Sequence, residues 1–145
     1  MSEKTVQWLT VLIFFFCFFA FTLAESAWLQ KKGGSSLGKA FAFAFATNIF
    51  TVTVGFALSF IVFAVLAAST IGTGLEPAAG NDGRVWAAGA ASLLLPIAVS
   101  VAAKRLLLRV FKLDAGVGPW AFAFVASALF VVVAAAVPVI ISSLA

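Results

Sequence analysis

Two residue types that carry much of enzyme and metal chemistry are missing from this chain. None of its 145 residues is histidine or tyrosine, and Cys17 is the only cysteine. Imidazole bases and histidine-ligated metals or haems are therefore excluded. One thiol is too few for a structural zinc site or an iron–sulfur cluster. It also excludes an internal disulfide, and we interpret Cys17 as a small apolar filler.

Charged residues are scarce as well. They make up 10% of the chain, against about 25% in ordinary soluble domains, while 64% of the residues are hydrophobic. The net charge of +4 is divided among short segments beside apolar runs, so it forms no coherent basic face for nucleic acid. This composition predicts a single membrane domain without nucleic-acid partners.

Four apolar runs are each long enough for a membrane helix, which needs about 20 apolar residues. Backbone polar groups in lipid must be paired internally, which favours helices over lone strands. We therefore predict an all-α protein, an antiparallel up-down bundle with short loops. The first run is interpreted as a spanning helix rather than a signal peptide, because Glu3 offsets Lys4 and no cleavage site is persuasive. The predicted helices cover residues 6–28, 40–70, 85–112 and 117–144.

The second predicted helix has a small and polar face. Residues 40–70 contain no charge, and five small or polar residues recur there at helical spacing: Ala44, Asn48, Thr51, Gly55 and Ser59. Small and polar residues are where membrane helices approach one another, so this face is predicted to contact other helices. Asn48 is interpreted as an interhelical hydrogen-bonding group, or alternatively as part of a solute or ion site. An apolar stripe beside it is predicted to face lipid or another subunit: Phe45, Ile49, Val52, Phe56, Phe60 and Phe63.

Glu25 lies where the first apolar run ends. One interpretation is an interfacial carboxylate, hydrated or paired with Lys31, Lys32 or Lys39. The other is that Glu25 turns inward and reaches Asn48, because Glu25 ends one helix of a hairpin and Asn48 lies about two turns into the next. Ionisable groups within a membrane are functional candidates by default, although one at the edge supports that only weakly.

A basic amphipathic segment follows the third apolar run. Lys104, Arg105, Arg109 and Lys112 are expected on one side of a helix and apolar residues on the other. Such a segment suits an anionic lipid surface or a partner; the alternative is a stop signal that only sets orientation. Within the run itself, Pro96 is expected to kink the helix, more simply as a static bend than as a hinge.

Four tryptophans fall at predicted helix ends, where indole rings prefer the membrane–water interface: Trp8, Trp28, Trp86 and Trp120. The first and third loops are rich in lysine and arginine, whereas Arg84 in the second loop is set against Glu76 and Asp82. By the positive-inside rule the first and third loops are cytoplasmic and both termini lie on the other side. The expected location is a bacterial inner membrane.

Three classes of function compete. The sequence favours a non-enzymatic accessory or scaffold subunit, packed among lipids and other membrane protein subunits, because its loops are short and bulky phenylalanines abound. The alternative is a small oligomeric transporter or channel that uses the polar face of residues 44–59. A membrane enzyme is disfavoured because acids and hydroxyls do not pair at a useful spacing. No catalytic, cofactor or metal residues are predicted, although a bound lipid or pigment is compatible with the many phenylalanines.

Overall fold

The computed structural model describes residues 3–71 and 82–144, and every regular element in these ranges is helical. Within these ranges, four helices are long and apolar enough to cross a membrane, which suggests a membrane location. The predicted second loop lies largely outside the described residues, as do the side chains of Arg84 and Trp86. The elements are α1 (Glu3–Gly33), α2 (Leu37–Phe50), the π-helical segment η1 (Thr51–Gly55), α3 (Phe56–Ile71), α4 (Asp82–Val110) and α5 (Pro119–Leu144).

Two helices, α1 and α4, end at other residues than predicted, in both cases near basic residues at their C-terminal ends. α1 continues through Lys31 and Lys32, whose charges complement the partial negative charge of a helix C-terminus. It ends because Gly34 adopts φ 63° and its N–H donates to the carbonyl of Gln30. α4 instead stops early, at Val110: Lys112 has φ 50°, and the next N–H donates to the carbonyl of Leu108 at 3.0 Å.

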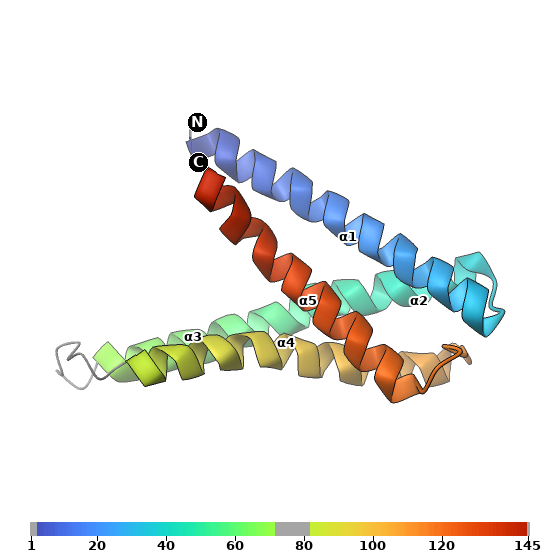
Figure 1. Cartoon of the computed structure of the whole chain (residues 1–145). Helices are drawn as coiled ribbons and strands as arrows, with labels where there is room; N and C mark the ends of the chain where they lie inside the picture. Colours follow the sequence, from blue (N-terminus) through green and yellow to red (C-terminus); the bar gives the residue numbers. More distant parts are fainter. Residues whose placement is uncertain (1–2, 72–81, 145) are drawn as a thin grey trace.

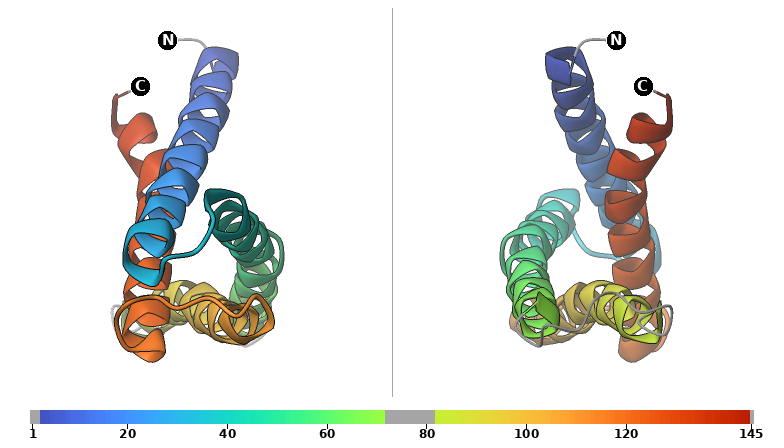
Figure 2. Two further views of the ribbon diagram at one scale, coloured as in Figure 1. Left: turned by 90° about the vertical axis from the view of Figure 1, so that its right-hand side faces the viewer. Right: turned by 90° about the vertical axis from the view of Figure 1, so that its left-hand side faces the viewer.

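The helices converge at one end of the molecule and diverge toward the other (Figure 1). α1 packs against α5, and α3 packs against α4, so two pairs are formed. Near the α1–α2 and α4–α5 connections, α2 also contacts both α1 and α4, and α4 packs against α5. We call this region the joined end. Away from it, the α1–α5 pair and the α3–α4 pair separate, as both side views show (Figure 2).

Two apolar clusters hold the pairs together. The first surrounds Leu29, Phe43 and Leu108 at the joined end. The second lies at the level where the pairs separate, and its buried members are Phe18, Phe130 and Val131. Phe45 of α2, Val52 of η1 and Phe56 of α3 pack against this second cluster. These three residues of the stripe predicted to face lipid or another subunit are therefore partly buried against side chains of this chain, whereas Ile49, Phe60 and Phe63 are exposed.

The segments α2, η1 and α3 form one continuous helix with a π-turn in its middle. At this turn the N–H of Phe56 donates to the carbonyl of Thr51, five residues earlier. Gly55 lies against α4, where an added Cβ would be 3.0 Å from Cβ of Pro96. A larger residue at 55 would therefore push the two helices apart.

Pro96 also explains a polar contact between α3 and α4. Proline has no N–H, so it cannot bond the carbonyl four residues earlier, which belongs to Ser92. The hydroxyl of Ser59 lies 2.8 Å from that carbonyl oxygen and 3.0 Å from the carbonyl oxygen of Gly55. Ser59 thus pairs a backbone group that proline leaves free within an apolar helix.

We expect Ser59→Ala to lower the free energy of unfolding by about 0.5–1.5 kcal/mol, the range of interhelical hydrogen bonds in membrane proteins. In a Pro96→Ala background the same change should cost less, because an alanine at that position has an N–H that can bond the Ser92 carbonyl. The measurement is unfolding in mixed micelles by titration with a denaturing detergent. Ser143→Ala is the control, since its exposed hydroxyl bonds only to Ile140 of its own helix. If Ser59→Ala lowered the free energy of unfolding equally with Pro96 present and in the Pro96→Ala background, the pairing of Ser59 with the carbonyl that Pro96 leaves free would be contradicted.

Candidate functional site

A buried group of polar side chains lies inside the joined end, where α1, α2 and α4 meet. Each of its members is at most 5% exposed. The helices bring together residues up to 82 positions apart in the sequence, from residue 22 to residue 104. We call this group the polar cluster; it consists of Thr22 and Glu25 from α1, Thr47 and Asn48 from α2, and Lys104 from α4.

The centre of the polar cluster is an ion pair between Glu25 and Lys104. The ammonium nitrogen lies 2.5 Å from Oε1 and 2.7 Å from Oε2 of the carboxylate. It also lies 3.0 Å from Oδ1 of Asn48 and 3.3 Å from Oγ1 of Thr47. The hydroxyl of Thr47 is within reach of carbonyls in its own helix, at 3.0 and 3.1 Å, so its oxygen is free to accept from the lysine. Lys104 is therefore surrounded by oxygen acceptors.

Asn48 completes the cluster by using both ends of its amide. Its Nδ2 donates to Oε2 of Glu25 and to Oγ1 of Thr22, each at 3.2 Å, while Oδ1 accepts from Lys104. An asparagine amide has two N–H groups and one carbonyl oxygen, so each group has a partner here. Within the described residues, neither Glu25 nor Lys104 has an unpaired buried polar atom.

The polar cluster lies well inside its helices. Glu25 is eight residues before the end of α1, and Lys104 is six residues before the end of α4. At 1.5 Å per residue these positions are roughly 12 and 9 Å from the helix ends. Isolated charges at such places are costly in an apolar medium, and mutual pairing with full hydrogen bonding offsets that cost.

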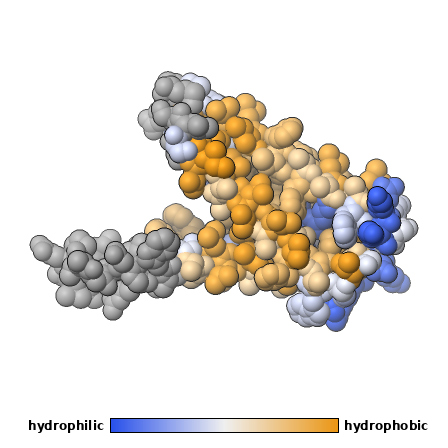
Figure 3. Space-filling view, viewed as in Figure 1, coloured by the Kyte–Doolittle hydropathy of each residue, from blue (hydrophilic) through white to orange (hydrophobic). Residues whose placement is uncertain are grey.

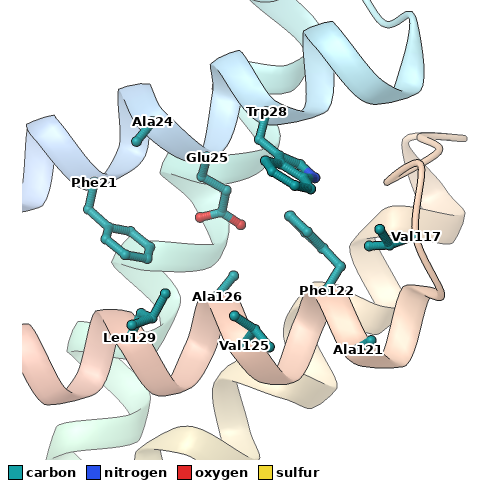
Figure 4. A pocket seen from close by; sticks show the side chains of 10 residues that line it. All are labelled: Phe21, Ala24, Glu25, Trp28, Val117, Ala121, Phe122, Val125, Ala126 and Leu129. Atoms are coloured by element: carbon teal, nitrogen blue, oxygen red, sulfur yellow. The ribbon is translucent and has the colours of Figure 1, made fainter.

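An apolar cavity of about 460 Å³ adjoins the polar cluster between α1 and α5. Glu25 projects from α1 toward it, with Phe21 and Trp28 on either side and Phe122 facing them from α5 (Figure 4). Trp28 is held in place because its indole N–H donates to the carbonyl of Ala115 at 3.1 Å. The rest of the wall consists of alanine, valine and leucine side chains, so the cavity suits an apolar group.

The structure corrects two sequence-based interpretations. Lys104 does not lie on a basic surface with Arg105, Arg109 and Lys112: it is 0% exposed and paired with Glu25. Residues five apart on an α-helix are separated by about 140° around its axis, so Lys104 and Arg109 need not share an environment. Glu25 is not paired with the loop lysines: it is buried, pairs with Lys104 and contacts Asn48, as the alternative interpretation had it.

The other residues singled out in the sequence have the following positions. All five members of the predicted polar face, from Ala44 to Ser59, are buried, but only Asn48 belongs to the polar cluster. Trp8 lies near the start of α1, whereas Trp28 and Trp120 lie at the joined end, and all three are exposed. Arg109 and Lys112 are exposed and Arg105 is partly buried.

Sequence reasoning missed Thr22 and Thr47 and the inward position of Lys104. A signal was present, because polar residues recur at helical spacing in three separate apolar runs. Thr22, Glu25 and Ser26 share one face of α1, and Ser100 and Lys104 are one turn apart on α4. Polar faces on three helices point to a common buried centre when each needs a partner in lipid.

Comparison with protein-family models, curated proteins and solved structures finds no match for this chain. Within the described residues, no group of three or more histidine, cysteine or acidic side chains is placed to hold a metal ion. The polar cluster is a hydrogen-bonded ion pair beside an apolar cavity.

Removing one partner of the ion pair should be costly, and removing both should cost much less. We expect Lys104→Met and Glu25→Gln each to lower the free energy of unfolding by about 3–5 kcal/mol, because a buried charge is left unpaired. The double variant should be clearly more stable than the sum of the single effects implies. Unfolding in mixed micelles measures this, with Lys31→Met as a control for loss of an exposed charge. Additive single effects would show that the two residues do not interact.

Asn48→Leu tests the amide independently of the ion pair. We expect a loss of about 1–3 kcal/mol, because hydrogen bonds to charged groups are removed on both sides of the amide. The same unfolding assay reports it. Thr53→Val is the matched control in the same long helix, since the exposed Thr53 hydroxyl bonds only within its own helix. Equal free energies of unfolding for the two variants would show that the Asn48 amide does not stabilise the polar cluster.

Proposed function

We propose that this chain is a non-enzymatic accessory or scaffold subunit of a larger membrane protein complex. The observation that supports this most directly is the divergence of the two helix pairs from a joined end (Figures 1 and 2). Beyond the second apolar cluster, α3 makes its extended contacts with α4 rather than with α1 or α5. Each pair therefore offers apolar side chains that the chain itself does not cover.

The exposed side chains on these separating segments are large. Phe16 on α1 is 74% exposed and Phe60 on α3 is 73% exposed. The space-filling view shows apolar surface along both pairs, while hydrophilic residues gather at the joined end (Figure 3). Bulky aromatic side chains of this kind suit grooves between helices of another subunit.

The saturated polar cluster also supports a packing role. A transport or catalytic site needs a group that is free to bind a solute or to exchange a proton. Here the carboxylate, the ammonium and the amide are each engaged with one another. Their arrangement serves to fix α1, α2 and α4 in one position.

We further propose that the four helices cross a bacterial inner membrane in alternating directions, as an up-down bundle at the joined end. The joined end would be cytoplasmic by the positive-inside rule. Its exposed or partly buried cations support this orientation: Lys31, Lys32, Lys39, Arg105, Arg109 and Lys112.

A small oligomeric transporter remains the second candidate, because Glu25 forms part of the wall of the α1–α5 cavity. In that case the purified chain would move a solute in liposomes without any other subunit. The scaffold proposal expects no solute movement, and it expects weaker association with other subunits in Glu25→Gln, because that variant loosens the joined end.

Site-specific photo-crosslinking in native membranes tests the scaffold proposal. We expect a photoreactive residue at position 16 or 60 to crosslink to a different polypeptide of defined mass, because Phe16 and Phe60 are the most exposed large hydrophobic residues of the separating segments. Position 124 is the control, since Phe124 is a similarly exposed aromatic residue of α5 close to the joined end. Adducts with lipid alone at positions 16 and 60, from a chain that migrates as a monomer in mild detergent, would refute the proposal.

A further inference from the structure

A second cavity, of about 280 Å³, lies at the joined end between the last turns of α4 and the start of α5. Three cationic side chains line it: Arg105, Arg109 and Lys112. We call it the basic cavity. Leu108, Leu113 and Pro119 form its apolar part. It is separate from the apolar cavity beside Glu25, because the two share no lining residue.

The side chain of Arg105 lines this cavity and has one donor without a hydrogen-bond partner among the described residues. Its guanidinium carbon lies 5.0 Å from the centre of the Trp120 ring, so the planar group is held over an aromatic face. Its Nε is buried and has no hydrogen-bond partner within the described residues. An unpaired donor on a charged group is costly when removed from water. Because Nε itself is shielded, a ligand with anionic oxygens in the cavity would pair the guanidinium through its other N–H groups.

The cavity holds little negative charge to oppose an anion. Its one acid is Asp114, whose Oδ1 accepts from the N–H of Gly116 at 2.9 Å. Among the described residues, no acid forms an ion pair with Arg105, Arg109 or Lys112. The last carbonyls of α4, from residues 107 to 109, already accept N–H groups of residues 111 to 113. The carbonyl groups at the C-terminal end of α4, which carry its partial negative charge, therefore already have hydrogen-bond donors.

The loop that closes the cavity is held firmly against α1. An added Cβ on Gly33 would overlap the carbonyl oxygen of Asp114, and one on Gly116 would lie 2.6 Å from Cβ of Lys32. Gly116 also has φ 68°, which favours glycine. Together with the Trp28–Ala115 hydrogen bond, this close packing keeps the cations in place before any ligand arrives.

We propose that the basic cavity binds the phosphate group of an anionic phospholipid. Arginine forks match phosphate oxygens in geometry and charge, and basic cavities at the surface end of membrane helices suit anionic headgroups. The position next to Trp120, at the end of an apolar helix, places a headgroup beside surface that its acyl chains can cover. This proposal does not depend on the scaffold role.

Native mass spectrometry of the purified full chain tests the proposal, with phosphatidylglycerol and phosphatidylcholine of identical acyl chains as probes. We expect tighter binding of phosphatidylglycerol. Arg109→Gln/Lys112→Gln should weaken that binding about tenfold. Lys31→Gln/Lys39→Gln removes the same charge from exposed positions at the same end and should change binding less than about threefold, since those residues do not line the cavity.

A second variant and a soluble probe separate the remaining outcomes. Arg105→Lys keeps the charge but loses the planar group over Trp120, so it should also weaken phosphatidylglycerol binding severalfold. Inorganic phosphate should compete poorly, because it has no acyl chains. Equal weakening in the two double variants, no preference between the lipids, or equally tight binding of inorganic phosphate would each overturn the proposal.

Discussion

The ion pair between Glu25 and Lys104 is the constraint on which the joined end depends. Neither charge is tolerable alone in an apolar medium, so the two residues must meet whenever the chain is folded. This requirement links the C-terminal part of α1 to the C-terminal part of α4, and Asn48 adds α2 to the same centre. Because the hydrogen bonds of the ion pair are directional, they fix the rotation of each helix about its axis as well as the contact between the helices. Apolar packing between similar side chains specifies that rotation less well.

The same constraint explains why the molecule is open at its other end. The described parts of α1, α3 and α5 away from the joined end contain few groups that must find a partner, so little holds the two helix pairs together there. The exception lies within the α3–α4 pair. Pro96 leaves the carbonyl of Ser92 free, Ser59 pairs it, and Gly55 allows the close approach. Local backbone chemistry thus keeps each pair together while the pairs diverge.

Much of the architecture could be predicted from the sequence, because the length of each apolar run indicates how many helices are long and apolar enough to cross a membrane. The burial of Asn48, Gly55 and Ser59 follows from their spacing on one face. The position of Lys104 did not follow, since its neighbours Arg105 and Arg109 suggested a uniformly basic surface. Helical rotation separates these residues, and only the long-range position of Glu25 decides which cation turns inward. The π-turn and the divergence of the pairs leave no local signal in the sequence.

Lys104 and Arg105 are adjacent, yet they serve opposite environments, and the ion pair explains how. Successive residues on an α-helix point about 100° apart. Once Lys104 faces Glu25, Arg105 is directed toward Trp120 and the basic cavity. A lysine suits the inner position because its compact ammonium has three protons for the oxygens of Glu25, Asn48 and Thr47. An arginine suits the outer position because its planar fork stacks on indole and leaves donors for a phosphate. The buried pair therefore sets the rotation of α4, and that rotation forms the basic cavity.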